Sequence, residues 1–191
     1  MAIIPDSVTI CYGKTAQLFA NIAIGTSYTW TPSGSLTNQG NGTISSTPYT
    51  IQAIASPSSS TNYVLKVMNA GCPNALADTF HVRVLPKIIL SAGRDTSIVN
   101  NQPLQLNATV GDSSVYQFTW SPPTGLNSTI IKNPLATLNS SMVDESITYI
   151  VRATNAIGCY AEDDVVVRVF KTGPDIFVPS GFTPNGDGKN D

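Results

Sequence analysis

Hydrophobic residues alternate with polar ones in short runs along most of the chain. Phe80, Val82 and Val84 have polar neighbours between them, and the same alternation recurs at 104–109. A period of two is typical of β-strands, because successive side chains point to opposite faces of a sheet. Clusters rich in Gly, Asn, Gln, Ser and Pro, such as 38–42 and 56–60, separate these runs and indicate turns. The pattern therefore predicts an all-β chain of short strands, with no amphipathic helix of useful length.

The chain also contains two copies of one unit of roughly 87 residues. The segment TWTPSGSL at 29–36 corresponds to TWSPPTGL at 119–126. The segment NYVLKVMNAGC at 62–72 corresponds to TYIVRATNAIGC at 148–159. Chance is a poor explanation for matches that keep their order along the chain. The junction between the copies is expected near Pro86.

Each copy has the size and pattern of a small β-sandwich. About 85 residues with six or seven short strands, one central tryptophan and no helix favour the immunoglobulin type. The prediction is therefore two tandem immunoglobulin-like sandwiches, at 1–86 and 87–171, followed by a linker and a further segment at 172–191. Four aromatic residues are predicted to fill the two cores: Trp30, Tyr63, Trp120 and Tyr149.

Composition excludes several classes of function. The formal net charge is −2, only 12% of the residues are charged, and no cluster of Lys and Arg is present. A nucleic-acid-binding protein needs a basic surface to neutralise phosphates, so no nucleic-acid partner is expected. No apolar run approaches the ~20 residues of a membrane helix. The first ten residues lack the basic and apolar regions of a signal peptide, so none is expected within the chain.

The chain has three cysteines, Cys11, Cys72 and Cys159, of which the last two occupy matching positions in the repeat. The simplest arrangement pairs Cys11 with Cys72 and leaves Cys159 free. That bridge would close a loop of about 60 residues, contribute roughly 4 kcal/mol and imply an oxidising compartment. Two buried, unpaired thiols are the alternative, because the bridge needs the two Cα atoms within about 7 Å. A catalytic cysteine is disfavoured, since the only histidine, His81, lies in the other copy from Cys159.

The pattern of alternating hydrophobic and polar residues ends after Val169. The segment IFVPSGFTPNGDGKND at 176–191 resembles the opening of the gliding-motility-associated C-terminal domain of Bacteroidetes surface proteins. The matching residues are 177–179, 182–188 and 190–191, and the difference is Ser180-Gly181, where that family often has Asn-Ala. The match is specific, but it covers only this final segment.

The resemblance implies a location more than an activity. That domain is similar to the type B sorting signal of the type IX secretion system, which delivers proteins to the bacterial cell surface or the medium. The two repeats also resemble the Ig-like or PKD-like units that often precede it. The chain is then expected to be part of a longer extracellular or outer-surface protein, with the sorting domain truncated and a signal peptide upstream.

The same final segment has a second interpretation from its residue types. Asn185, Asp187, Asn190 and Asp191 space oxygen ligands around Gly186 and Gly188. This resembles part of a calcium loop, in which carboxylates and carbonyls bind the ion. It lacks the bidentate Glu that completes an EF-hand. A glycine- and asparagine-rich turn in a frayed terminus is the favoured alternative.

The preferred hypothesis is a non-catalytic structural or adhesive module that projects another region from the cell surface. It is expected to be a monomer, with a surface polysaccharide or a protein as its ligand. The alternative is a carbohydrate-binding module of a secreted polysaccharide-degrading enzyme, which would need a row of exposed aromatic residues. Tyr12, Tyr28 and Tyr49 are the candidates for that row. An enzyme is least favoured, because no nucleophile, base and orienting group occur in a recognisable pattern.

Overall fold

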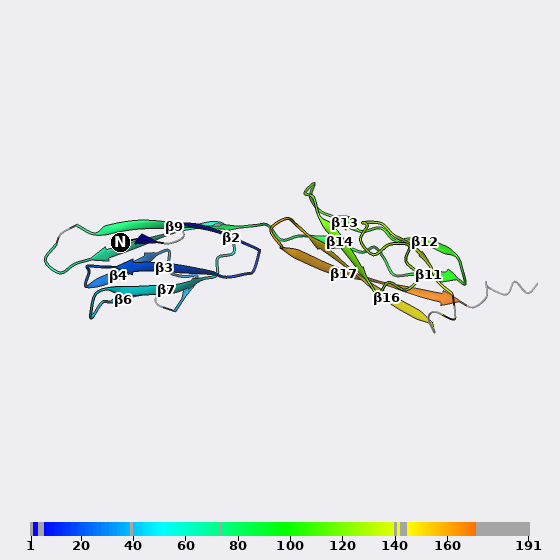
Figure 1. Ribbon diagram of the computed structural model, residues 1–191, viewed down its shortest axis with the longest axis horizontal. Helices are drawn as coiled ribbons and strands as arrows, with labels where there is room; N and C mark the ends of the chain where they lie inside the picture. Colours follow the sequence, from blue (N-terminus) through cyan, green and yellow to red (C-terminus); the bar gives the residue numbers. More distant parts are fainter. Residues whose placement is uncertain are drawn as a thin grey trace, which may run out of the picture. The chain divides into compact units, whose positions relative to one another are not determined.

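The computed structural model describes residues 2–3, 6–38, 40–72, 74–139, 141 and 145–170. Every regular element in this part of the chain is a β-strand (Figure 1). No helix there is long and apolar enough to cross a membrane. The chain divides into a first unit, Met1–Lys87, and a second unit, Ile88–Asp191. The boundary lies one residue from the predicted one, and the segment 172–191 lies outside the described residues.

The first unit is a sandwich of two sheets. One sheet has the order β1-β3-β7-β5 and the other has the order β2-β9-β8-β4-β6. The strands are β1 (Ala2–Ile3), β2 (Ser7–Ile10), β3 (Ala16–Ile22), β4 (Ser27–Thr31), β5 (Leu36–Thr37), β6 (Asn41–Thr43), β7 (Tyr49–Ala55), β8 (Thr61–Met68) and β9 (Leu76–Val84). All pairs are antiparallel except β2 with β9, which run parallel from Ser7 opposite His81 to Ile10 opposite Val84.

The second unit repeats this plan, with shorter strands on the side opposite its larger sheet. Its larger sheet has the order β11-β17-β16-β14, and the opposite side is formed by the pairs β10-β13 and β12-β15. The strands are β10 (Leu90–Ser91), β11 (Thr96–Val99), β12 (Pro103–Gln105), β13 (Thr109–Val110), β14 (Gln117–Ser121), β15 (Leu135–Thr137), β16 (Ser146–Thr154) and β17 (Tyr160–Phe170). The pair β11-β17 is parallel, like β2-β9. No described strand covers the outer edge of β14, whereas β6 covers the matching strand β4.

The alternating residues form one apolar core in each unit. Trp30 and Trp120 are only 2% and 3% exposed, and Tyr63 and Tyr149 are fully buried. The alternation is clearest on β8, where Tyr63, Leu65 and Val67 are buried and their neighbours are half-buried or exposed. No polar or charged residue among those described is buried. The predicted all-β fold of two tandem immunoglobulin-like sandwiches is confirmed.

The buried tyrosines also connect each core to a loop. The Tyr63 hydroxyl lies 2.5 Å from the Ser35 hydroxyl. The Tyr149 hydroxyl donates a hydrogen bond to the carbonyl of Thr124. These two loops follow β4 and β14 at matching places in the repeat. Burial of Tyr149 raises the pKa of its hydroxyl to about 12, because the phenolate would lose its hydration.

We expect the stability of the second unit to fall between pH 10 and pH 12 because of Tyr149. Its folded pKa of about 12 exceeds the ~10 of an unfolded tyrosine. The unfolded chain therefore loses the proton first, so this stability is complete below pH 10 and is lost as the pH rises to 12. Tyr149→Phe should cost about 1 kcal/mol at pH 8 through the lost hydrogen bond. The substitution should also remove the part of the stability loss above pH 10 that comes from ionisation of Tyr149.

The measurement is urea unfolding at pH 8 and pH 11, followed by the amide NMR signals of the second unit. Tyr160→Phe is the control, because that ring is 53% exposed. Should Tyr149→Phe lose as much stability as the wild type between the two pH values, the assignment to Tyr149 is wrong.

Candidate functional site

The structure overturns the predicted bridge between Cys11 and Cys72. Cys72 is exposed and free, whereas Cys11 and Cys159 are disulfide-bonded. Cys11 follows the end of β2, beside the last residue of β9. Cys72 lies in the turn that precedes β9, where its N–H donates to the carbonyl of Asn69. The nine residues of β9, at ~3.3 Å each, therefore separate the two cysteines, far beyond the ~7 Å that a bridge allows.

Cys159 was expected to be the free thiol, and this is also wrong. It is 5% exposed and lies in the turn between β16 and β17. The Asn155 side chain holds this turn, because its carbonyl oxygen accepts the N–H of Cys159 at 3.0 Å and that of Ile157 at 3.0 Å. Cys72 and Cys159 occupy matching positions in the repeat, yet Cys72 is a free thiol and Cys159 is disulfide-bonded. Similarity between the two copies therefore could not predict which cysteine is free.

We expect iodoacetamide to modify Cys72 alone in the unreduced protein, even after unfolding in urea. Mass spectrometry should find one adduct before reduction and three after it, since the chain has three cysteines. Cys72→Ser should abolish the single adduct and leave the other two unchanged. An adduct on Cys11 or Cys159 without reductant would contradict the observed pairing state.

The predicted calcium ligands Asn185, Asp187, Asn190 and Asp191 lie outside the described residues. Within the described part of the chain, no group of three or more His, Cys, Asp or Glu side chains could hold a metal ion. The structure thus offers no other candidate metal centre among those residues.

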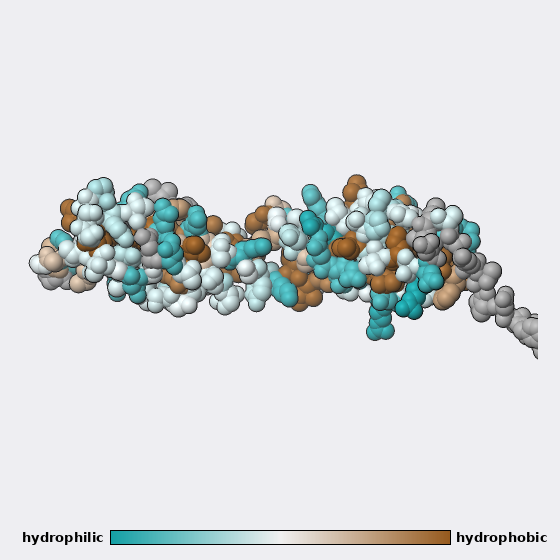
Figure 2. Space-filling view, turned by 90° about the horizontal axis from the view of Figure 1, so that it is seen from below, coloured by the Kyte–Doolittle hydropathy of each residue, from teal (hydrophilic) through white to brown (hydrophobic). Residues whose placement is uncertain are grey.

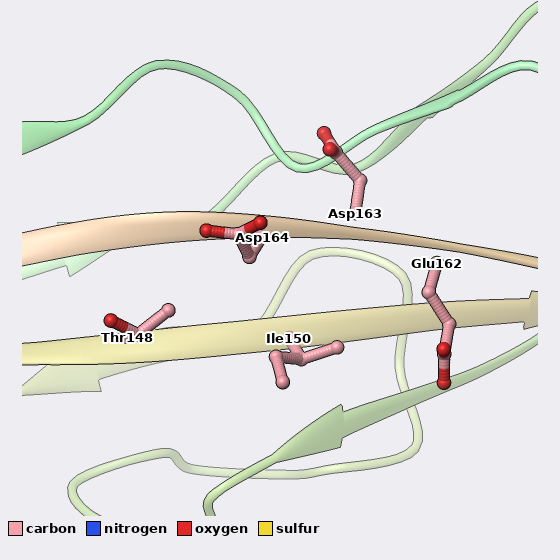
Figure 3. Close-up of a pocket in the computed structure, with 5 residues that line it drawn as sticks. All are labelled: Thr148, Ile150, Glu162, Asp163 and Asp164. Carbon is pink, nitrogen blue, oxygen red and sulfur yellow. The ribbon is translucent and has the colours of Figure 1, made fainter.

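An acidic depression of about 300 Å³ lies on the larger sheet of the second unit. Figure 3 shows the carboxylates of Glu162 and Asp164 on one side of the strands, while Asp163 points to the other. Glu162 pairs with Arg152 at 2.7 Å, and the Asp163 carboxylate accepts the N–H of Ala92 at 2.8 Å. Two of the three carboxylates, those of Glu162 and Asp163, therefore have partners within the fold. The run 162–164 lies in β17, with two of its residues exposed.

A larger groove, of about 640 Å³, follows the uncovered edge of β14. On one side are the half-buried rings of Tyr116 and Phe118, with centroids 6.5 Å apart and planes at 62°. On the other side is the segment 130–132, in which Ile130 is 74% exposed. On the face of the second unit seen in Figure 2, apolar patches (brown) lie between polar ones. Sequence analysis missed this groove, because the alternation on β14 looks the same for a covered and an uncovered edge.

Hydrogen bonds hold both sides of the groove. The N–H of Trp120 donates to the carbonyl of Thr129 at 2.7 Å, and its indole Nε1–H donates to the carbonyl of Ile131 at 3.1 Å. The Tyr116 hydroxyl donates to the Asp112 carboxylate at 3.0 Å. Desolvation, and then this carboxylate, raise the pKa of Tyr116. The groove is therefore formed before any ligand arrives.

The tyrosines considered for sugar stacking do not form an exposed row. Tyr28 is buried at 3% exposure, and its ring lies 6.0 Å from that of the half-buried Tyr49. Tyr12 is exposed, in the turn after β2. These three residues therefore do not present a stacking surface for a sugar.

Comparison with protein-family models and with curated proteins finds no match. Among solved structures, a C-terminal 282-residue fragment of intimin, in complex with the intimin-binding domain of the translocated intimin receptor, has a TM-score of 0.50 at 11% identity. The match covers 91% of this chain and 64% of that one. Other similar structures are the IG1+IG2 region of DIP-gamma (TM-score 0.44, 12% identity, 90% and 98% covered) and the I-band fragment I67–I69 of titin (0.44, 13%, 85% and 62%).

These likenesses concern the fold alone, since the identities are so low. The chain spans less than two thirds of the intimin and titin chains that it matches. The class that the fold defines is a tandem immunoglobulin-like protein.

Proposed function

We propose that this chain is a non-catalytic structural or adhesive module of an extracellular protein. The observation that carries the proposal is the parallel pairing of the first and last long strands of each unit, β2 with β9 and β11 with β17. A two-residue strand, β1 or β10, precedes each pair, so tension that has passed it enters through β2 or β11 and leaves through β9 or β17. Parallel strands pulled from opposite ends are loaded in shear, so all the hydrogen bonds between them resist together.

The contacts at these ladders support this role. In the first unit, the N–H of His81 donates to the carbonyl of Asp6 at 2.8 Å, and that of Leu85 donates to Ile10 at 2.9 Å. In the second unit, the N–H of Asn100 donates to the carbonyl of Phe170 at 2.9 Å. The Asp95 carboxylate also accepts the N–H of Val166 at 2.9 Å. Bonds beyond both ends of the paired segments lengthen the ladder that bears the load.

The cysteines support the proposed compartment, and the C-terminal resemblance supports the proposed pathway. Disulfides persist in oxidising compartments, and Cys11 and Cys159 are disulfide-bonded. The resemblance of 176–191 to a type B sorting domain supports delivery by type IX secretion in a gliding-type Bacteroidetes bacterium. We include calcium binding by Asn185 and Asp187 in the proposal, with a surface protein or polysaccharide as the ligand of a monomeric chain.

We expect Val8→Pro to lower the force at which the first unit unfolds. Parallel alternation directs the Val8 N–H toward β9, so proline removes a ladder bond worth roughly 1 kcal/mol. Ser7→Pro is the matched control, because Ser7 is exposed and its N–H points away from β9. The measurement is single-molecule force spectroscopy in reductant, so that only the non-covalent ladders bear load. Equal unfolding forces for the two variants would refute a load-bearing role of this ladder.

We also expect an antibody against the two units to label the surface of intact cells of the source organism. Disruption of a type IX translocon gene should move the antigen from the surface or the medium into the cell. Disruption of an unrelated outer-membrane gene is the control. Antigen that stays inside wild-type cells would contradict the proposed location. Surface antigen unaffected by the translocon would contradict only the pathway.

A further inference from the structure

The outer edge of β14 is occupied at Trp120, which bonds to Thr129, but it is open at Phe118, where backbone groups can pair with another strand. In β14 the N–H of Trp120 points away from β16, because it donates to Thr129. Phe118 lies two residues earlier and therefore presents its N–H and C=O to the same edge. Groups of this kind are a template for strand addition.

The first unit shows what occupies the matching place. There β6 lies antiparallel to β4, with Gly42 directly opposite Tyr28, the residue that corresponds to Phe118. A Cβ atom on Gly42 would lie 3.0 Å from Oη and 3.2 Å from Cε1 of Tyr28. A strand beside this aromatic ring therefore has little room for a side chain, and glycine fits there without displacing the ring. In the second unit the segment 129–132 lies beside β14 but bonds to its backbone only at Trp120, and the groove lies between this segment and Phe118.

The positive charge of Lys132 at the groove favours an acidic residue near the end of a strand that binds there. Lys132 lies over Phe118, with its Nζ 6.0 Å from the ring centroid. Among the described residues the one ion pair is Arg152–Glu162, so Lys132 has no carboxylate partner there. An acidic side chain on the incoming strand would supply that partner.

We propose that the β14 edge binds an extended peptide strand of a partner protein, antiparallel to β14, with glycine opposite Phe118 and a carboxylate beside Lys132. A sugar fits less well, because the rings of Tyr116 and Phe118 are half-buried and steeply inclined rather than presented as a platform. A second copy of the chain also fits less well. Symmetric pairing about Phe118 would place two phenylalanine rings where the first unit needs glycine.

The test is a titration of the ¹⁵N-labelled chain with synthetic nine-residue peptides. Each peptide has glycine as its second residue, followed by alternating Thr and Val, so that it extends from Phe118 toward Tyr116 and away from the occupied edge at Trp120. The peptides end in Glu, Gln or Lys at either terminus. We expect saturable binding of the Glu peptides with Kd below about 1 mM. The shifted amide signals should be those of 116–119 and 130–132, and the Phe118 amide should gain protection from exchange.

Two variants and one control sharpen the test. Lys132→Glu should weaken binding of the Glu peptides roughly fivefold and favour the Lys peptides, as expected for an exposed ion pair. Ile130→Asp should weaken binding of every peptide. Ile24→Asp, at a position 68% exposed in the first unit, should leave binding unchanged. A peptide with tryptophan in place of this glycine should not bind.

Binding of no peptide, or equal binding of the Glu and Lys peptides, would overturn the proposal. Shifts outside the groove would do the same. If the chain dimerises in sedimentation and Ile130→Asp prevents it, the occupant is a second copy and the partner strand is refuted. Soluble glycans that shift the same amides while the peptides do not would assign the groove to sugar.

Discussion

The whole structure depends on the contact between two sheet faces in each unit. A domain of this size buries only a modest share of its surface, so few side chains stabilise it. Trp30 and Tyr63 in one unit, and Trp120 and Tyr149 in the other, are the largest of them. Burial of a large apolar side chain contributes about 1.5–3 kcal/mol. Because no described polar residue is buried, the cores have little other than this contact to hold them.

The two units differ in whether the indole N–H of the central tryptophan has a hydrogen-bond acceptor. The Trp120 indole N–H donates to the carbonyls of Ile131 and Lys132, whereas that of Trp30 is buried without a partner. An unsatisfied buried donor costs about 1–3 kcal/mol. The segment that satisfies Trp120 is also one side of the β14 groove. In the second unit, the same residues therefore complete the core and shape the surface beside an open strand.

Among the described residues, the outer faces of the sheets carry only exposed cross-strand contacts. The features relevant to function therefore lie at the edges of the sheets and at the ends of the strands. On the outer face of β16 and β17, Arg152 pairs with Glu162 and lies 4.3 Å from the Tyr160 ring centroid. Such exposed contacts contribute little each. Strand ends determine which cysteines can approach one another, and strand edges determine where another chain can pair. The features that matter for function therefore lie where the regular pattern stops.

The sequence by itself determined that the chain forms short strands, which side chains of the clearest alternating runs face a core, and that two similar units follow one another. These properties depend on neighbouring residues, since a period of two assigns each side chain to a face. The sequence did not show that the alternating run 104–109 divides into β12 and β13. It did not determine that Cys72 is free or that the edge of β14 is uncovered. Both depend on pairing between residues far apart in the chain, such as Ser7 with His81 and Gly42 with Tyr28. The same alternation is compatible with a covered or an open edge, so only the tertiary structure decided between them.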